Sequence, residues 1–204
     1  MSNESFAERI VADARAAASD DGRLPLPDMA DWDIFPFEGE FRVKQIEEIA
    51  LPEPARHGEL GSDDCQSCQR DDEEFLWTSE YWRLKATEPA GLPATVLLEP
   101  RAHYDLADLP DERARELGPL MLKVERAILS LGGIGRVHIS RWGDGGAHLH
   151  WWFMARPAGL LQLMGSFSSA WLDVLPPRPQ AEWDDTMRRI AEAMSSGTNS
   201  PNRP

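Results

Sequence analysis

The chain has 204 residues, 42% hydrophobic and 27% charged, enough for one well-packed domain with an extension or for two very small domains. Its formal net charge of −14 repels polyanions, which argues against general nucleic-acid binding and against adhesion to anionic membranes. No run of about 18 apolar residues is present, and residues 1–18 are polar, so we expect no membrane span, no signal peptide and a cytoplasmic location.

The first 60 residues are predicted to be an extension of the main domain. Within residues 4–18, apolar side chains recur at helical spacing, which predicts a short Ala-rich amphipathic helix. Residues 24–54 are rich in Pro, Asp and aromatic side chains and predict an irregular arm, with short strands around residues 41–46. A polar hinge then leads into the predicted core domain, residues 61–160.

The predicted core domain contains five strands. Alternating apolar and polar residues, bounded by Gly and Pro, are typical of half-buried strands. These runs are residues 75–78, 81–86, 95–99, 136–142 and 148–155. Because helices do not alternate regularly with the strands, the order indicates an α+β fold with an antiparallel sheet.

One long helix is predicted between the third and fourth strands. It begins near Asp108 and Pro110 and ends at Gly132-Gly133. Pro119 lies inside this helix and is expected to kink it or to split it near Gly118. Its buried stripe is predicted to be Leu117, Leu120 or Met121, Val124, Ile128 and Leu131.

The C-terminal part is predicted to be a helical extension, residues 161–194. A helix is expected at residues 183–194, after the break at Pro176-Pro177. The remaining tail, residues 195–204, is expected to be disordered.

The chain has only two cysteines, Cys65 and Cys68, in a C-x-x-C pair. Unused thiols, a redox pair and half of a zinc site all fit this spacing. The acidic residues on both sides raise a thiol pKa, which disfavours the redox pair, whereas a bound metal drives thiol deprotonation itself. Adding His103 and His148 gives a Cys₂His₂ set suited to tetrahedral zinc, although the spacing is not that of a zinc finger.

A glycine-rich turn at residues 143–146 precedes a predicted strand that carries two histidines. On a strand, His148, His150 and Trp152 share one face, and paired imidazoles are costly in a plain core because their nitrogens need partners. The turn fits either an anion-binding nest of N–H groups or an ordinary hairpin loop. Residues 151–153 taken alone fit core packing. The two remaining histidines, His57 and His138, are interpreted as ordinary structural residues.

Taken in order, these pieces resemble the histidine-triad (HIT) superfamily over about residues 64–157. The matching parts are Cys65-x-x-Cys68, Leu97-Leu98-Glu99-Pro100-Arg101-Ala102-His103, a helix, and Gly145-Gly146-Ala147-His148-Leu149-His150-Trp151-Trp152 with Arg156. The family pattern is His-φ-His-φ-His-φ-φ, and its middle histidine is the nucleophile. Matching Arg156 to the arginine after that motif makes His148 the first position, His150 the second and Trp152 the third.

The resemblance implies a HIT-like antiparallel sheet and a function. It implies a nucleotidyl hydrolase or transferase that acts on a small nucleotide or nucleotide sugar through a covalent nucleotidyl-histidine at His150. It also implies a structural zinc ion, and a homodimer, since many relatives form one. The residues it implies are the zinc ligands Cys65, Cys68, His103 and His148, the catalytic-site residues His150 and Trp152, and the substrate-binding residues Gly145, Gly146, Arg141 and Arg156.

Two departures from the family pattern bear on activity. Trp152 replaces the third histidine and cannot shuttle a proton, and Thr95 replaces a further histidine of some hydrolases. The galactose-1-phosphate uridylyltransferase branch also lacks the third histidine and has glutamine there, so the site is more similar to that branch. The alternative function is a catalytically silent binding protein for a nucleotide or partner that keeps the zinc.

Overall fold

The computed structural model describes residues 6–45 and 47–196, and its contacts divide the chain into two units, residues 1–54 and 55–204. In the first unit, α1 (Phe6–Ala17) confirms the predicted helix, whose first residues lie outside the described part. The predicted strands around residues 41–46 are wrong, although Ile46 itself lies outside the described residues. The Val43 carbonyl accepts a hydrogen bond from the Arg23 side chain (3.0 Å) in place of a strand partner.

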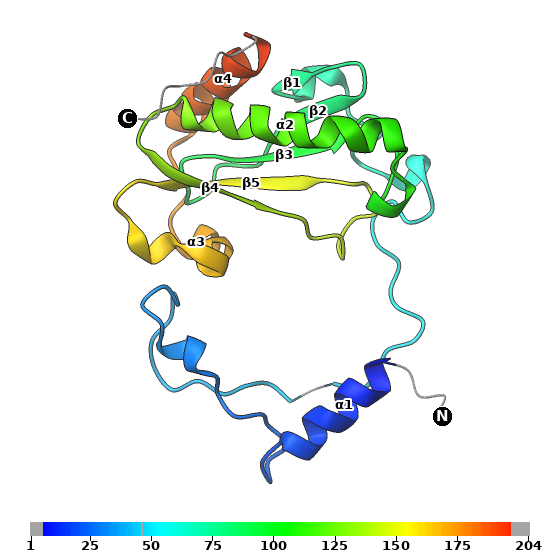
Figure 1. The fold of residues 1–204 in the computed structure, drawn as a ribbon, viewed down its shortest axis with the longest axis vertical. Helices are drawn as coiled ribbons and strands as arrows, with labels where there is room; N and C mark the ends of the chain where they lie inside the picture. Colours follow the sequence, from blue (N-terminus) through cyan, green and yellow to red (C-terminus); the bar gives the residue numbers. More distant parts are fainter. Residues whose placement is uncertain (1–5, 46, 197–204) are drawn as a thin grey trace. The chain divides into compact units, whose positions relative to one another are not determined.

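The second unit contains a five-stranded, fully antiparallel sheet with strand order β1-β2-β3-β5-β4 (Figure 1). Together with the helices this is the α+β architecture predicted from the sequence. The strands are β1 (Trp77–Thr78), β2 (Trp82–Ala86), β3 (Thr95–Pro100), β4 (Ile134–Ser140) and β5 (Trp151–Pro157).

The predicted strand at residues 148–155 begins three residues later than expected. His148, Leu149 and His150 precede β5, because the backbone groups of this segment bond elsewhere. The N–H of Leu149 donates to the Tyr104 carbonyl (2.7 Å), and the His148 carbonyl accepts from the His150 ring (2.8 Å). His148 and His150 therefore lie in the segment that leads into β5.

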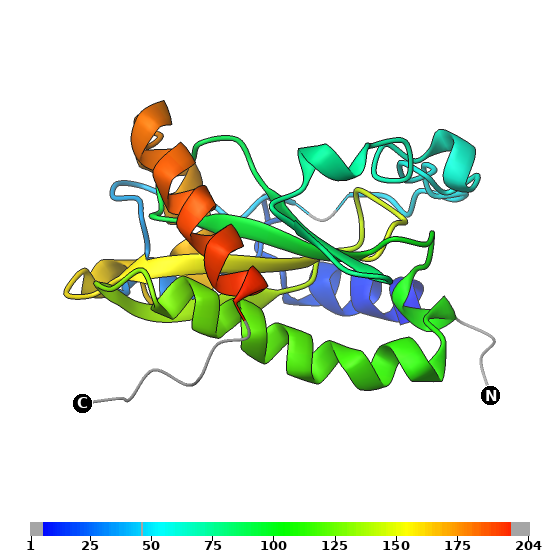
Figure 2. The same ribbon diagram turned by 90° about the horizontal axis from the view of Figure 1, so that it is seen from above.

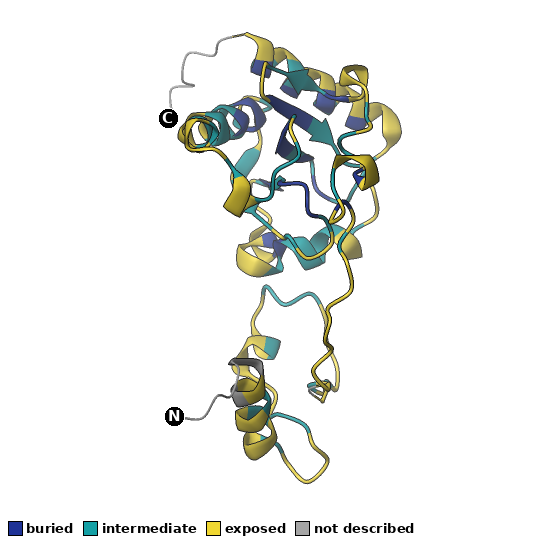
Figure 3. Ribbon diagram, turned by 90° about the vertical axis from the view of Figure 1, so that its right-hand side faces the viewer, coloured by how far each residue is buried: buried dark blue, intermediate teal, exposed yellow. Residues whose placement is uncertain are grey.

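Helices α2 (Asp111–Leu129) and α4 (Gln180–Ser195) cover one face of the sheet (Figures 1 and 2). The buried residues gather between these helices and the strands (Figure 3). The predicted split of the long helix is wrong: α2 runs through Pro119 without interruption. Pro119 is exposed, so water can solvate the one carbonyl that loses its helical hydrogen bond.

The opposite face of the sheet is only partly covered. Helix α3 (Ser168–Val174), which sequence patterns did not single out, brings Trp171 and Leu172 to a small core around Met154. The other end of this face is covered by the cysteine loop and carries the site described below. Of the predicted disordered tail, Ser195 ends α4, and residues 197–204 lie outside the described residues. No described helix is both long and apolar enough to cross a membrane.

Candidate functional site

Four predicted metal ligands from distant parts of the chain converge on one point. The ligand atoms of Cys65, Cys68, His103 and His148 all lie within 4.8 Å of one another. The Cys68 sulfur is 3.4 Å from Nδ1 of both His103 and His148, and the Cys65 sulfur is 3.5 Å from Nδ1 of His148. In a tetrahedral site with ordinary Zn–S and Zn–N bonds, sulfur and nitrogen ligands stand about 3.6 Å apart. The donor set therefore fits zinc.

The backbone brings these ligands together without a regular element. Cys65 directly follows the 3₁₀ turn Ser62–Asp64, His103 comes after β3, and His148 comes before β5. Gly58 packs against the cluster at φ +78°, and a Cβ atom there would lie 3.2 Å from both Cys65 Cβ and His103 Cε1. The backbone angle therefore favours glycine at position 58, and a Cβ atom there would also be tightly placed.

Hydrogen bonding and burial set the protonation states of His148 and Cys68. The carbonyl of Pro100 lies 2.8 Å from Nε2 of His148 and can only accept, so Nε2 carries the proton and Nδ1 presents its lone pair to the cysteines. Burial lowers the pKa of His148, which keeps its ring neutral. Burial and the hydrogen bond with Cys65 raise the pKa of the Cys68 thiol to about 12, so a metal must displace its proton.

A buried ion pair holds the cysteine loop on the sheet. Arg83 on β2 and Glu99 on β3 are 4% and 2% exposed, and their side chains meet at 2.9 Å. Arg83 also donates to the Ser67 carbonyl (2.9 Å), and the Ser67 hydroxyl donates to Glu99 (3.2 Å). Ser67 lies between the two cysteines, so this pair fixes the loop that presents both thiols.

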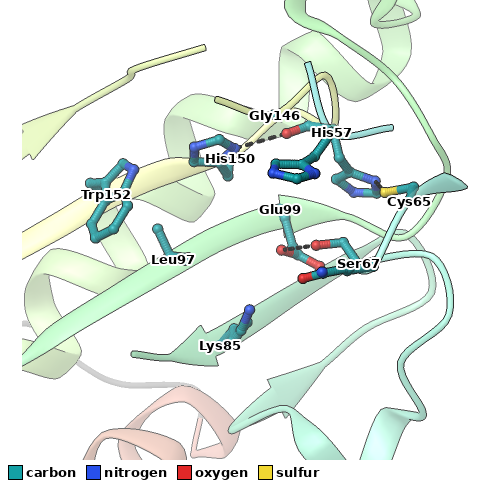
Figure 4. A pocket seen from close by; sticks show the side chains of 11 residues that line it. His57, Cys65, Ser67, Lys85, Leu97, Glu99, Gly146, His150 and Trp152 are labelled. Carbon is teal, nitrogen blue, oxygen red and sulfur yellow. Dashed lines mark hydrogen bonds between the residues drawn. The ribbon is translucent and has the colours of Figure 1, made fainter. Parts of the chain in front are cut away.

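Beside the metal ligands is a cavity of about 220 Å³ (Figure 4). It confirms the predicted common face, because His148, His150 and Trp152 all line it. The other lining residues come from the cysteine loop, β2, β3 and two loops: His57, Cys65, Gln66, Ser67, Lys85, Leu97, Glu99 and Gly146.

His150 is held in one tautomer. Its Nδ1 lies 2.8 Å from the carbonyl of His148, which can only accept, so Nδ1 carries the proton. The Nε2 atom then carries a lone pair, and no hydrogen bond among the described residues engages it. A neutral imidazole with a free Nε2 at a cavity is arranged to act as a nucleophile or as a base.

Trp152 narrows the cavity without filling it. Its ring centroid is 6.2 Å from that of His150 and 5.9 Å from that of Trp142. Its Nε1 is buried with no hydrogen-bond partner in the described part of the chain. The cavity that remains, about 220 Å³, is several times the roughly 30 Å³ that one water molecule occupies. The cavity that His150 lines is therefore large enough for a phosphoryl group.

The structure brings only one of the four predicted substrate-binding residues, Gly146, to the cavity. The Gly145 carbonyl instead accepts from the N–H of His57 (3.1 Å). Arg141 is ion-paired with Asp105. Arg156 is buried, and its Nη1 donates to the carbonyls of Pro157 (3.1 Å) and Leu160 (3.3 Å). The turn at residues 143–146 lies in the loop that joins the antiparallel strands β4 and β5, and its end pairs with the His57 backbone.

Sequence reasoning missed six residues of the cavity lining, and three of them carry ionisable side chains: Lys85, Glu99 and His57. Glu99 and Lys85 lie on neighbouring strands and face away from the helices, which strand alternation beside Trp82 and Leu84 could have indicated. The position of His57 depends on a backbone β-bridge to Gly146, which no local sequence pattern predicts.

Comparisons with known proteins bear on the fold. No family model and no curated protein matches the sequence. A solved structure of a hypothetical histidine triad nucleotide-binding protein from Sulfolobus tokodaii matches 64% of this chain and 92% of its own, with 15% identity and a TM-score of 0.50. A zinc-bound histidine triad family protein from Mycobacterium smegmatis matches 66% and 96%, with 19% identity and a TM-score of 0.49. A uridylyltransferase structure matches 66% of this chain and 46% of its own, with 21% identity and a TM-score of 0.46.

The chain therefore has the histidine-triad fold that its motifs led us to expect. At these identities the comparisons bear on the fold alone. What the site does must be argued from its own residues.

Proposed function

We propose that this protein is a nucleotidyl hydrolase or transferase that acts on a small phosphorylated nucleotide, with His150 as the nucleophile. The observation that carries the proposal is the hydrogen bond of 2.8 Å from Nδ1 of His150 to the His148 carbonyl. It leaves the Nε2 lone pair free in a cavity with space for a phosphoryl group.

The chemistry is a displacement in two steps. Nε2 of His150 forms a bond to the α-phosphorus, and the bond from phosphorus to the leaving oxygen breaks with its electron pair. Water or a second substrate then attacks the same phosphorus, and the P–N electron pair returns to Nε2. Dividing one displacement into two lowers each barrier, and a neutral imidazole is a good nucleophile near pH 7.

Lys85 is the positive group that we assign to the phosphoryl oxygens. Its side chain lines the same cavity, and none of the described residues forms an ion pair or hydrogen bond with it (Figure 4). Glu99, the carboxylate of the cavity lining, is already paired with Arg83 at 2.9 Å. Burial lowers the pKa of Lys85, and an anionic substrate beside it would favour its charged form. Lys85 is therefore the unpaired cation available to a phosphoryl group, a role that Arg141 and Arg156 cannot fill from their positions.

We assign a structural zinc ion to Cys65, Cys68, His103 and His148. Four protein ligands leave no open coordination position, so the metal would clamp the cysteine loop to the approach to β5 rather than activate water. His148 would join the two parts of the site, since its ring is a ligand and its carbonyl orients His150. Metal analysis that finds less than about half an equivalent of zinc, with both thiols freely titratable, would rule this assignment out.

Turnover of labelled substrates tests the proposal. The full-length, zinc-loaded protein and its His150→Ala variant are incubated with nucleoside diphosphate sugars, dinucleoside polyphosphates and aminoacyl adenylates. We expect the wild type to release or transfer a nucleotide from at least one of these, and His150→Ala to lose that activity. Absence of turnover across the panel would contradict the proposal.

The second candidate is a catalytically silent protein that uses the cavity to bind a nucleotide or partner. It is favoured by one observation, the bulk of Trp152 beside the nucleophile. Binding of a nucleotide by calorimetry, with no turnover and no adduct on His150, would support it.

A further inference from the structure

His57 is attached to the loop that precedes the candidate nucleophile. Its N–H donates to the Gly145 carbonyl (3.1 Å), and its carbonyl accepts from the N–H of Ala147 (2.9 Å). The neighbouring Arg56 donates to the Gly143 carbonyl (3.0 Å) and pairs with Asp105 (2.7 Å). These bonds fix the main chain at residue 57, while its imidazole lines the same cavity as His150 (Figure 4).

The proposed displacement also needs a proton donor for the leaving oxygen. Among the other cavity residues, His148 has both ring nitrogens engaged, by the Pro100 carbonyl and by the cysteine sulfurs. Glu99 is held by Arg83 and Ser67. Trp152 has only an indole N–H, which is buried and is not an acid near neutral pH. His148 and Glu99 would have to break existing contacts to transfer a proton, and the indole of Trp152 does not ionise near neutral pH.

Cys65 is a proposed zinc ligand, and Gln66, Ser67 and Leu97 have no group that ionises near neutral pH, so His57 and Lys85 are the ionisable cavity side chains that remain. Proton transfer from the Lys85 ammonium group to the leaving oxygen would remove the positive charge that is assigned above to the phosphoryl oxygens. An imidazole gives and takes a proton near neutrality. No hydrogen bond or ion pair among the described residues engages the His57 ring, and the residue is exposed, so water and a leaving group can reach it.

Resting on the function proposed above, we propose that His57 is the acid and base of the reaction, in place of an imidazole at position 152. As Nε2 of His150 bonds to phosphorus, the protonated His57 gives its proton to the leaving oxygen. In the second step, neutral His57 takes a proton from the attacking water. The P–N electron pair returns to Nε2 of His150, and both histidines are restored.

Leaving-group dependence tests this assignment directly. The probes are the 4-nitrophenyl and phenyl esters of UMP and AMP, whose leaving groups differ in their need for a proton. Removal of a general acid costs about 10²–10⁴-fold in rate when the leaving group needs its proton. For zinc-loaded His57→Gln, we expect a loss of this size in kcat for the phenyl esters and a loss below about tenfold for the nitrophenyl esters. His138→Gln, which changes a half-buried histidine outside this cavity, is the matched control and should retain wild-type rates.

A second readout separates proton transfer from a structural role. Free imidazole added to His57→Ala should restore a large part of the lost phenyl-ester rate and should not accelerate the wild type. Equal losses on both leaving groups, or no rescue by imidazole, would overturn the role of His57 while leaving His150 in place. A wild type that cleaves neither ester and forms no adduct on His150 would overturn the proposed function itself.

Discussion

The buried pair of Arg83 and Glu99 makes the sharpest stability prediction. Glu99→Gln keeps the shape of the side chain and removes its charge, so the Arg83 guanidinium is left buried beside a neutral amide. Both side chains are at most 4% exposed and meet at 2.9 Å, so solvent screens neither of them. The variant therefore isolates the cost of one unpaired buried charge.

Removal of one partner of a buried pair costs about 3–5 kcal/mol in the free energy of unfolding. In a folded unit of this size, each kcal/mol shifts Tm by roughly 2–4 °C, so Glu99→Gln should lower Tm by about 6–20 °C. Replacing both charges, as in Arg83→Met with Glu99→Gln, removes the unpaired charge. The double variant should be destabilised by less than the sum of the two single variants.

Urea unfolding of the zinc-loaded wild type, both single variants and the double variant completes the cycle. It is followed by tryptophan fluorescence, because Trp82 and Trp183 lie in the main core. A loss below about 1 kcal/mol for Glu99→Gln, or additive losses in the double variant, would refute the argument that this pair is desolvated.

Three further predictions concern the metal, the tryptophan and pH. Cys68→Ser should bind less than about half an equivalent of zinc and should have a lower Tm than the wild type. A chelator should lower the Tm of the wild type and leave that of the variant unchanged. Metal analysis and calorimetry measure both effects. Since Trp152 leaves the cavity large enough for a phosphoryl group, Trp152→Gln should change kcat by less than about tenfold; activity that arises only in the variant would favour the silent binding protein. Burial lowers the pKa of His138, so the unfolded chain binds a proton first and stability falls as pH drops below about 6.5. His138→Asn should reduce this acid slope in urea unfolding, by up to about 1.4 kcal/mol per pH unit, and an unchanged slope would contradict the assignment.

The sequence predicted the parts of this molecule that depend on local pattern. The strand at residues 95–99 was found almost to the residue, because a β-branched and apolar run ends at Pro100. The four proposed metal ligands were also chosen from residue type and order, and the structure brings them together. Strand alternation correctly placed His148, His150 and Trp152 at one cavity.

The parts that depend on long-range contacts were not predicted. The start of β5 is set by the bond between Leu149 and Tyr104, which no periodicity encodes. Arg141 and Arg156 were expected to bind the substrate, yet Arg141 pairs with Asp105 and Arg156 donates to backbone carbonyls outside the cavity. His57 was interpreted as an ordinary structural residue, because its position at the cavity depends on backbone hydrogen bonds with the distant residues Gly145 and Ala147.

The most direct test of the central claim is to trap the covalent intermediate. Zinc-loaded wild-type protein is mixed with the 4-nitrophenyl ester of UMP or AMP, stopped in alkali within the first turnover, and mapped by mass spectrometry. We predict a nucleotidyl group on the peptide that carries His150, stable in alkali, lost in acid, and absent from His150→Ala. Substrate cleavage with no such group on His150, or the same adduct in His150→Ala, would contradict the account.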